Sequence, residues 1–167
     1  MVKPPDDSVT KTTDTPTQTT PLPGLFDEAR HLVIEELHRR LGDEGYTTIR
    51  ESHGCVFRFI DAQGSRLTDL ADRARLTKQA VGEVVDDLEG LGYVERAPHP
   101  LDGRAKIIRL TELGQEGQRA AKRVFADIER ELAERFGEQR VATLREVLEQ
   151  ITAEGIAPAA GERKAAA

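Results

Sequence analysis

Residues 76–110 decide the fold of this chain: LTKQAVGEVVDDLEGLGYVERAPHPLDGRAKIIRL. Thr77 is a favourable N-cap residue, and the valines and leucines that follow repeat at spacings of three and four as far as Leu91, which predicts an amphipathic helix with one buried stripe. Gly92 stands where a left-handed residue ends such a helix. Two β-forming runs around an Asp-Gly turn then predict a short hairpin. A helix with an open polar N-terminus, followed by a basic hairpin, is typical of a winged helix-turn-helix, which is a DNA-binding unit.

A second helix is predicted immediately before this segment. Thr68 is expected to cap it, and Asp69 lies in its first turn, where the helix dipole favours an anion. Ala71 and Ala74 are small, so the two helices can approach closely. Only a short turn at 75–77 joins them, as a helix-turn-helix requires.

The segments on the N-terminal side add further helices. A first helix is expected at about 25–41. Thr48 and Glu51 have capping-box spacing, which predicts a helix that extends to Ile60. Residues 66–67 are expected to form a short strand that pairs with the hairpin. The fold class is therefore expected to be α+β and mostly α-helical.

Composition suggests where the domain begins and ends. Residues 1–23 are rich in Thr, Pro and Asp and cannot bury enough apolar surface to offset their ordering entropy, so we expect a disordered tail there and another at 157–167. Residues 24–156 are expected to form one domain with a head at about 46–110. Helices at about 25–41 and at 111–152 are expected to mediate dimerisation, the latter capped by Thr111 and interrupted by Gly137.

The net charge of −6 argues against a general affinity for polyanions, but the charges are unevenly distributed. The hairpin is basic, with Arg96, Arg104, Lys106 and Arg109 against Asp102. The C-terminal helices are acidic. Such a protein is expected to bind DNA through base contacts and dimerisation rather than through charge alone.

Several classes of protein are disfavoured. No apolar run approaches the roughly 20 residues of a membrane span, and the N-terminus lacks the pattern of a secretory signal, so we expect a cytoplasmic protein without membrane contact. Cys55 is the single cysteine, and the four histidines are dispersed, so neither a disulfide nor a metal site is expected. Motifs for phosphate binding or nucleophilic catalysis are lacking, which indicates a protein that is not an enzyme and needs no cofactor.

The start of the helix at Thr77 supplies the candidate base-contacting residues. Gln79 can pair with adenine, and Lys78 with guanine or a phosphate. Gly82 permits close approach of the backbone, while Glu83 can accept from cytosine or repel phosphate. The alternative is an ordinary surface helix with a solvated polar face.

The tip of the hairpin supplies a second set of candidates. Arg104 can lie in a minor groove, and Asp102 can hold its guanidinium through a bidentate pair. Lys106 and Arg109 are expected to face phosphates. Alone, this segment is equally compatible with a polar surface turn.

Residues 26–151 resemble the multiple antibiotic resistance regulator (MarR) family. The motifs that carry the resemblance are LTDLA at 67–71, TKQAV at 77–81, LEGLGYVER at 88–96, DGRAK at 102–106 and RLTELG at 109–114. The resemblance implies a homodimer built from the first, fifth and sixth helices, two winged heads and a palindromic operator. It also implies that Asp102 and Arg104 form a pair in the wing, and that Thr77, Lys78 and Gln79 begin the recognition helix.

Members of this family are commonly repressors that are released by small aromatic or phenolic ligands or by cysteine oxidation. Arg50 and His53 are candidates to line a ligand crevice, because an anionic aromatic ligand requires such donors. Cys55 is a candidate redox site if its cationic neighbours lower the pKa of the thiol, and otherwise a small buried hydrophobic residue. The sequence therefore predicts a homodimeric DNA-binding repressor, with a redox-sensing repressor or a winged-helix protein-interaction module as alternatives.

Overall fold

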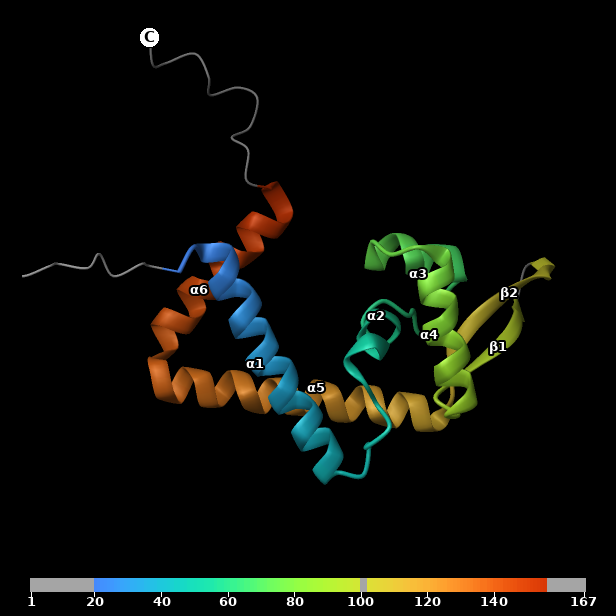
Figure 1. The fold of residues 1–167 in the computed structure, drawn as a ribbon, viewed down its shortest axis with the longest axis horizontal. Coiled ribbons are helices and arrows are strands. Elements are labelled where there is room, and N and C mark those ends of the chain that lie inside the picture. The colour runs from blue at the N-terminus through green and yellow to red at the C-terminus, as the bar shows by residue number, and fades with distance from the viewer. Residues whose placement is uncertain (1–19, 100–101, 156–167) are drawn as a thin grey trace, which may run out of the picture.

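The computed structural model describes residues 20–99 and 102–155, without the side chains of residues 102–104. The elements, in chain order, are α1 (Leu22–Asp43), the 3-10 helix η1 (Glu51–His53), α2 (Gly54–Phe57), α3 (Leu67–Ala74), α4 (Lys78–Gly90), β1 (Val94–His99), β2 (Asp102–Leu110), α5 (Glu112–Phe136) and α6 (Glu138–Glu154). Figure 1 shows α2, α3, α4 and the hairpin grouped at one end, α1 and α6 at the other, and α5 extending along both. The predicted α+β, mostly helical fold is confirmed.

The helix-turn-helix is formed by α3 and α4. Arg75 ends α3 in the left-handed region at φ 55°, and the amide of Leu76 donates to the carbonyl of Ala71 at 3.0 Å. The chain is extended at Thr77, whose Oγ1 accepts the amide of Ala80 at 3.1 Å. The predicted cap of α4 is therefore confirmed.

The predicted cap of α3 is wrong. The helix begins at Leu67 after an extended Arg66, so Thr68 already lies within the first turn. Its hydroxyl contacts the Oδ1 of Asp69 at 3.3 Å instead of a backbone amide. The reason is that α3 starts one residue earlier than the cap pattern indicates.

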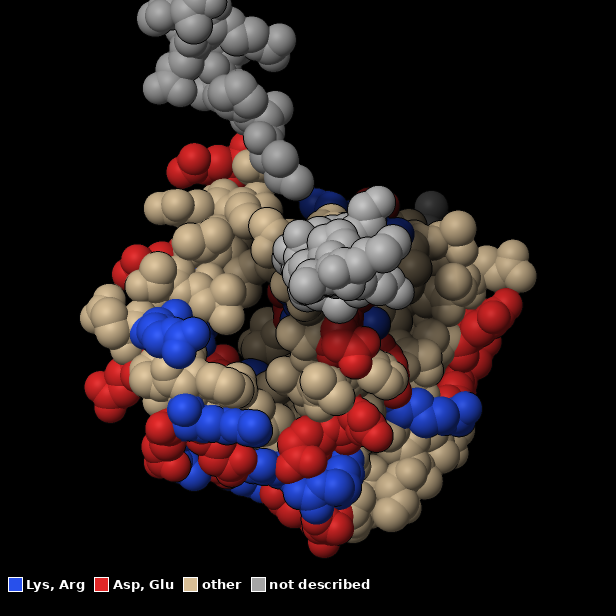
Figure 2. Space-filling model, turned by 60° about the vertical axis from the view of Figure 1, so that its left-hand side comes forward, with Lys and Arg blue, Asp and Glu red and all other residues tan. Residues whose placement is uncertain are grey.

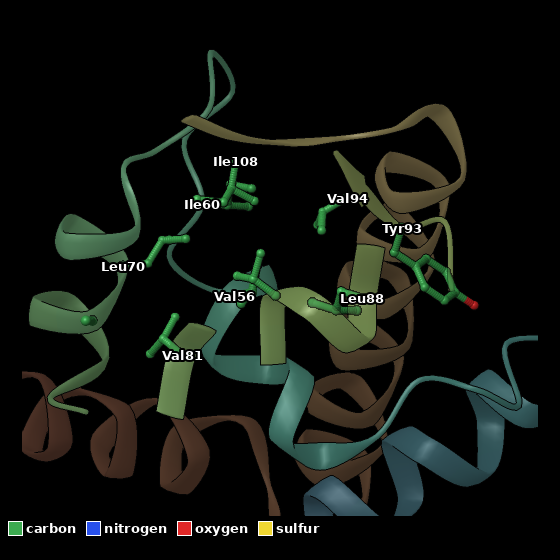
Figure 3. Packing of buried hydrophobic residues seen from close by; sticks show 10 residues of the cluster. Val56, Ile60, Leu70, Val81, Leu88, Tyr93, Val94 and Ile108 are labelled. Carbon is green, nitrogen blue, oxygen red and sulfur yellow. The ribbon is translucent and has the colours of Figure 1, made fainter. Parts of the chain in front are cut away.

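The head has one apolar core, to which α2, α3, α4 and the hairpin all contribute. Figure 3 shows its side chains pointing toward one another, among them Val56, Leu70, Val81, Leu88, Val94 and Ile108. Each of these side chains is at most 3% exposed. Burying one such side chain contributes about 1.5–3 kcal/mol, so this core fixes the orientation of α4.

The junction between α4 and the hairpin is rigidly defined. Gly92 lies at φ 81°, and the amides of Gly92 and Tyr93 donate to the carbonyls of Glu89 at 3.0 Å and Leu88 at 2.9 Å. This is the Schellman pattern that a left-handed glycine permits. Val94 then opens β1, so the course of the hairpin is set by the end of α4.

The hairpin pairs antiparallel from Val94 opposite Leu110, with an irregularity after Pro98. A third segment pairs with β2, but it is Ser65 opposite Ile108 rather than the predicted strand at 66–67. The prediction is displaced because Gly64, at φ 92°, already turns the chain beside β2, and Leu67 is helical.

The single helix expected from Thr48 to Ile60 is also wrong. The chain instead forms η1 and the one-turn α2. Arg50, not Thr48, is the N-cap, and its amide donates to Nδ1 of His53 at 3.2 Å. The hydroxyl of Thr48 lies 3.0 Å from the hydroxyl of Tyr93, so a tertiary contact replaces the local cap.

A second, smaller core joins α1 to α5. It contains Leu37, Leu41, Ala120, Val124 and Ile128. The predicted cap of α5 is confirmed, because Thr111 Oγ1 accepts the amide of Gly114 at 3.1 Å. The break at Gly137, with φ 97°, is confirmed as well.

The N-terminal boundary differs slightly from the prediction. Residues 22 and 23 already belong to α1 and residues 20 and 21 precede it, whereas the remainder of both predicted tails, 1–19 and 157–167, lies outside the described residues. Within the described segments, no helix is both long and apolar enough to cross a bilayer.

Candidate nucleic-acid interface

The outer face of α4 presents the residues that the sequence singled out. Thr77, Lys78, Gln79 and Glu83 are exposed, whereas Val81, Val85 and Leu88 on the opposite face are fully buried. Gln79 Nε2 donates to Glu83 Oε1 at 3.2 Å, so these two side chains form one polar unit. The helix thus has a solvent-facing side whose groups can meet a ligand without disturbing the core.

Gly82 lies on the same face, half-buried between the polar positions. A β carbon added there would have Leu67 Cδ2, at 3.8 Å, as its nearest neighbour, which is an ordinary contact. Packing within the chain therefore does not require glycine at this position. This agrees with a surface on which a larger side chain would project outward.

The electrostatics of the α4 N-terminus favour an anion. The first turn of α4 carries no acidic residue, and Lys78 opens it. Unpaired amides and the positive end of the helix dipole gather at such a terminus, which makes it a suitable site for a phosphate. Arg75, exposed in the preceding turn, adds a further positive charge.

The hairpin extends away from the body beside α4 (Figure 1). Lys106 and Arg109 are exposed on β2, with Lys106 opposite Pro98 and Arg109 opposite Glu95. Asp102 and Arg104 lie on the same strand, but their predicted pair falls outside the described side chains.

Arg96 is not part of this basic surface. Its guanidinium binds Asp86 at 2.5 Å and also Glu89, both on α4. Burial lowers the pKa of Arg96, but the two carboxylates outweigh burial and raise it overall. Arg96 therefore links β1 to α4. The sequence predicted four basic side chains on the hairpin, and Arg96 is not available to a ligand as one of them.

A cluster on the other side of α4 joins it to the segment before α2. Arg50 Nη2 donates to both carboxylate oxygens of Asp87, at 2.9 and 2.6 Å. His53 Nε2 lies 2.7 Å from Asp87 Oδ2, and the hydrogen bond to His53 lowers the pKa of Asp87 together with the charge of Arg50. Arg50 and His53 are therefore brought together, but around Asp87.

A cleft of about 550 Å³ lies between α1, the η1–α2 segment and α5. Its floor is apolar, with Ile34, Leu37, Leu41, Phe57 and Phe125. Its charged lining residues are Arg30, Arg50, Glu51, Arg58 and Lys122. Arg50 thus lines a crevice as predicted, whereas His53, at 1% exposure, is buried behind it.

Known proteins share this architecture. Residues 45–105, from just after α1 into β2, match the sequence model of the MarR family. The crystal structure of a MarR-family transcriptional regulator from Rhodococcus sp. RHA1 has a TM-score of 0.61 and 25% identity, over 81% of this chain and 99% of that one. The head of this chain therefore resembles those of the MarR family.

Two further similarities agree with this resemblance. The chain is 41% identical over 54 residues to HTH-type transcriptional regulators of Mycobacterium bovis and Mycobacterium tuberculosis, and this match spans 32% of the chain and 38% of each relative. The transcriptional repressor CouR, solved with a 23-mer DNA duplex, has a TM-score of 0.65 at 24% identity, over 79% of this chain and 92% of CouR.

The surroundings of Cys55 differ from those that the redox hypothesis requires. Burial raises the pKa of its thiol, whereas the hypothesis required a lowered pKa. The thiol donates to the carbonyl of Ser52 at 3.1 Å. The expected cations are engaged elsewhere, Arg50 with Asp87 and Arg58 over the ring of Phe59 at 5.1 Å.

Asp87 is the residue that sequence analysis missed. Its position beside Leu88 and three residues after Val84 places it at the edge of the buried stripe. A carboxylate at the edge of a core requires a partner, because burying a charge without one is costly. The sequence therefore indicates that Asp87 has a partner, but which residues pair with it depends on the tertiary fold.

Proposed function

We propose that this protein is a sequence-specific DNA-binding transcriptional regulator that acts as a homodimeric repressor at a palindromic operator. The observation that carries the proposal is the first turn of α4, which is capped by Thr77, exposes Lys78 and Gln79 and lacks acidic residues. The match of residues 45–105 to the MarR family and the DNA-bound structure of CouR, a protein of the same fold, support it.

Each exposed group has a role in this proposal. Gln79 contacts adenine and Glu83 restricts the choice of base, while Lys78 pairs with guanine or a phosphate. Gly82 lets the backbone approach the duplex. Thr77 and the Lys106 side chain contact phosphates, which set the position of the head without specifying sequence.

The wing completes the contact. Arg104 enters a minor groove and Asp102 holds its guanidinium, in the manner that the family resemblance implies. The head, at about 46–110, then contacts both grooves of one half-site. Two heads roughly 34 Å apart, one turn of the duplex, match the two halves of a palindrome.

The exposed apolar surface of α1, α5 and α6 gives a physical reason for dimerisation. α6 has no buried residue, and an apolar groove of about 780 Å³ lies between α1, α5 and α6. Large apolar side chains remain exposed along these helices, including Leu25, Leu32, Phe136, Leu144, Val147 and Leu148. Figure 2 views this end, where uncharged surface extends above a belt of charged residues at the lower edge. A second copy is the occupant that we propose for this surface, since symmetric association buries the same apolar patch on both chains.

The proposed effector is a small aromatic or phenolic anion in the cleft beside Arg50. An apolar floor with a few cationic groups suits such a molecule. CouR from Rhodococcus jostii RHA1, which shares the fold, has been solved with p-coumaroyl-CoA. A ligand that prefers a different spacing of the two heads lowers DNA affinity by shifting the population of the dimer.

The test begins with selection of bound fragments from the source genome. Operator affinity is then measured by fluorescence anisotropy for the parent, Gln79→Ala and Arg104→Ala. Gln79→Ala is expected to relax selection at one base pair per half-site by about 1–3 kcal/mol, and Arg104→Ala to weaken binding broadly, most at A·T-rich flanks. A parent protein that binds no duplex at any salt concentration would instead indicate the protein-interaction module.

A further inference from the structure

Arg50 belongs to two sites at once. It lines the cleft, and its guanidinium binds Asp87 on the helix proposed to contact DNA. We propose that Asp87 and an anion in the cleft compete for Arg50, so that occupancy of the cleft changes how firmly α4 is held. The competition rests on the effector site of the proposed function but not on its operator binding, because it is measured without DNA.

The contact between Arg50 and Asp87 is an exchangeable one. The two side chains are 64% and 36% exposed, so water and small ions can reach the pair. Exposed ion pairs of this kind contribute at most about 1 kcal/mol. A carboxylate bound nearby can therefore take the guanidinium without a large cost in stability.

The contact between His53 and Asp87 is, in contrast, fixed. The backbone amide of Arg50 donates to Nδ1 of His53, so in the neutral ring Nε2 carries the proton and donates to Asp87 at 2.7 Å. His53 is only 1% exposed and is held among the residues of the head. Asp87 thus has one permanent partner and one that it can lose.

The surrounding charges favour Arg50 as the group that an anion takes. Arg30 is paired with Glu51 at 2.6 Å, and Glu51, unlike Asp87, itself lines the cleft, so an anion beside Arg30 would meet a like charge. Arg58 lies over the ring of Phe59. Lys122, on α5, is the further cation in the lining, so a carboxylate in the cleft meets one positive group on the head and one on the long helix.

Release of Arg50 is expected to loosen one end of α4 more than the other. Asp87 lies in the second half of this helix, while Lys78 and Gln79, which are proposed to contact the bases, lie in its first turn. With Arg50 released, Asp87 keeps His53 but loses one of the two side chains that tie this part of α4 to the segment before α2. The proposal predicts faster amide exchange there when the cleft is filled.

The experiment compares a hydroxycinnamate with its neutral amide, in the absence of DNA. Binding to the full-length parent, Asp87→Asn and Asp86→Asn is measured by calorimetry. Asp86→Asn is the matched control, because Asp86 is the adjacent carboxylate and pairs with Arg96 on the wing side. Asp87→Asn is expected to bind the hydroxycinnamate about two- to fivefold more tightly, with no change for the amide or in Asp86→Asn.

The sign of the effect separates competition from a merely structural role, which would weaken binding or leave it unchanged. Equal affinity of the parent and Asp87→Asn for the anion would overturn the proposal, as would failure of the parent to bind it.

Arg50→Gln, which keeps a polar side chain, should weaken binding of the anion selectively and provides the answer if Asp87→Asn does not fold. Hydrogen exchange should show α4 loosened by the hydroxycinnamate in the parent, and no such loosening would also overturn the proposal. Since DNA is absent, loss of the proposed operator binding leaves these results interpretable.

Discussion

Gly114 of α5 lies so close to Tyr93 that a β carbon at Gly114 would stand 2.0 Å from the Tyr93 carbonyl oxygen. The same carbonyl accepts the amide of Thr111 at 3.1 Å and lies 3.2 Å from its hydroxyl. The first turn of α5 is therefore pressed against the start of the wing. This contact sets the position of the head relative to the long helix.

Gly114→Ala is expected to destabilise the fold by roughly 1–3 kcal/mol or more, because the added carbon must displace backbone rather than a flexible side chain. Urea unfolding followed by circular dichroism measures the change. Gly90→Ala is the control, since a β carbon there meets no atom within 4 Å and helix propensity favours alanine. Equal midpoints for the two variants would show that the close approach is relieved at no cost.

Tyr93→Phe removes the hydroxyl that lies 3.0 Å from Thr48 Oγ1. The ring itself stays in the core, where Figure 3 shows it at the edge with its hydroxyl pointing outward. We expect a loss of about 0.5–1.5 kcal/mol, the usual contribution of one hydrogen bond. A double-mutant cycle with Thr48→Ala isolates the pair, and additive losses would show that the two hydroxyls do not interact.

The parts of the fold that the sequence predicted depend on local interactions. Thr77 and Thr111 cap their helices, and Gly92 ends α4, because each of these structures involves residues only a few positions apart. Thr48 failed as a cap because its hydroxyl contacts Tyr93, 45 residues away. A contact between residues so far apart in the chain cannot be predicted from the local spacing of residues.

The candidate site also combines features that depend on neighbouring residues with features that depend on the tertiary fold. The exposure of Lys78 and Gln79 follows from helical periodicity alone. The loss of Arg96 to the carboxylates of α4, and the gathering of Arg50 around Asp87, follow from how the hairpin and η1 pack on that helix. Side-chain charge could be counted from the sequence, but its partners could not.

Glu36 should contribute to stability at neutral pH and lose that contribution in acid. Hydrogen bonds from Arg39, and then from Arg40, lower the pKa of this carboxyl from 4.5 to about 2. Because the folded-state pKa is depressed, the stabilisation is present above pH 4.5 and is lost as the pH falls toward 2. Glu36→Gln should therefore show a shallower decline of the urea midpoint over this range, and parallel curves would contradict the assignment.

Lys106→Ala and Lys78→Ala should each reduce the salt dependence of operator binding. Each phosphate contact that is removed lowers the slope of log K against log salt by about 1. Lys122→Ala is the matched control, because this lysine lines the cleft on α5. Anisotropy titrations at several salt concentrations provide the slopes, and a Lys106→Ala slope equal to that of the parent would remove this residue from the interface.

Leu144→Glu should convert the proposed dimer into monomers. Leu144 is 54% exposed in the single chain and lines the groove between α1, α5 and α6, so a partner that covers it would have to bury the new charge. Leu113→Glu is the control, since this leucine is also exposed, at 41%, but lies in the first turn of α5 near the wing. Sedimentation equilibrium gives the mass of each variant. The monomer should bind a single half-site weakly and lose the operator affinity that two linked heads provide. A dimeric Leu144→Glu protein with unchanged operator affinity would place the subunit interface elsewhere on the chain.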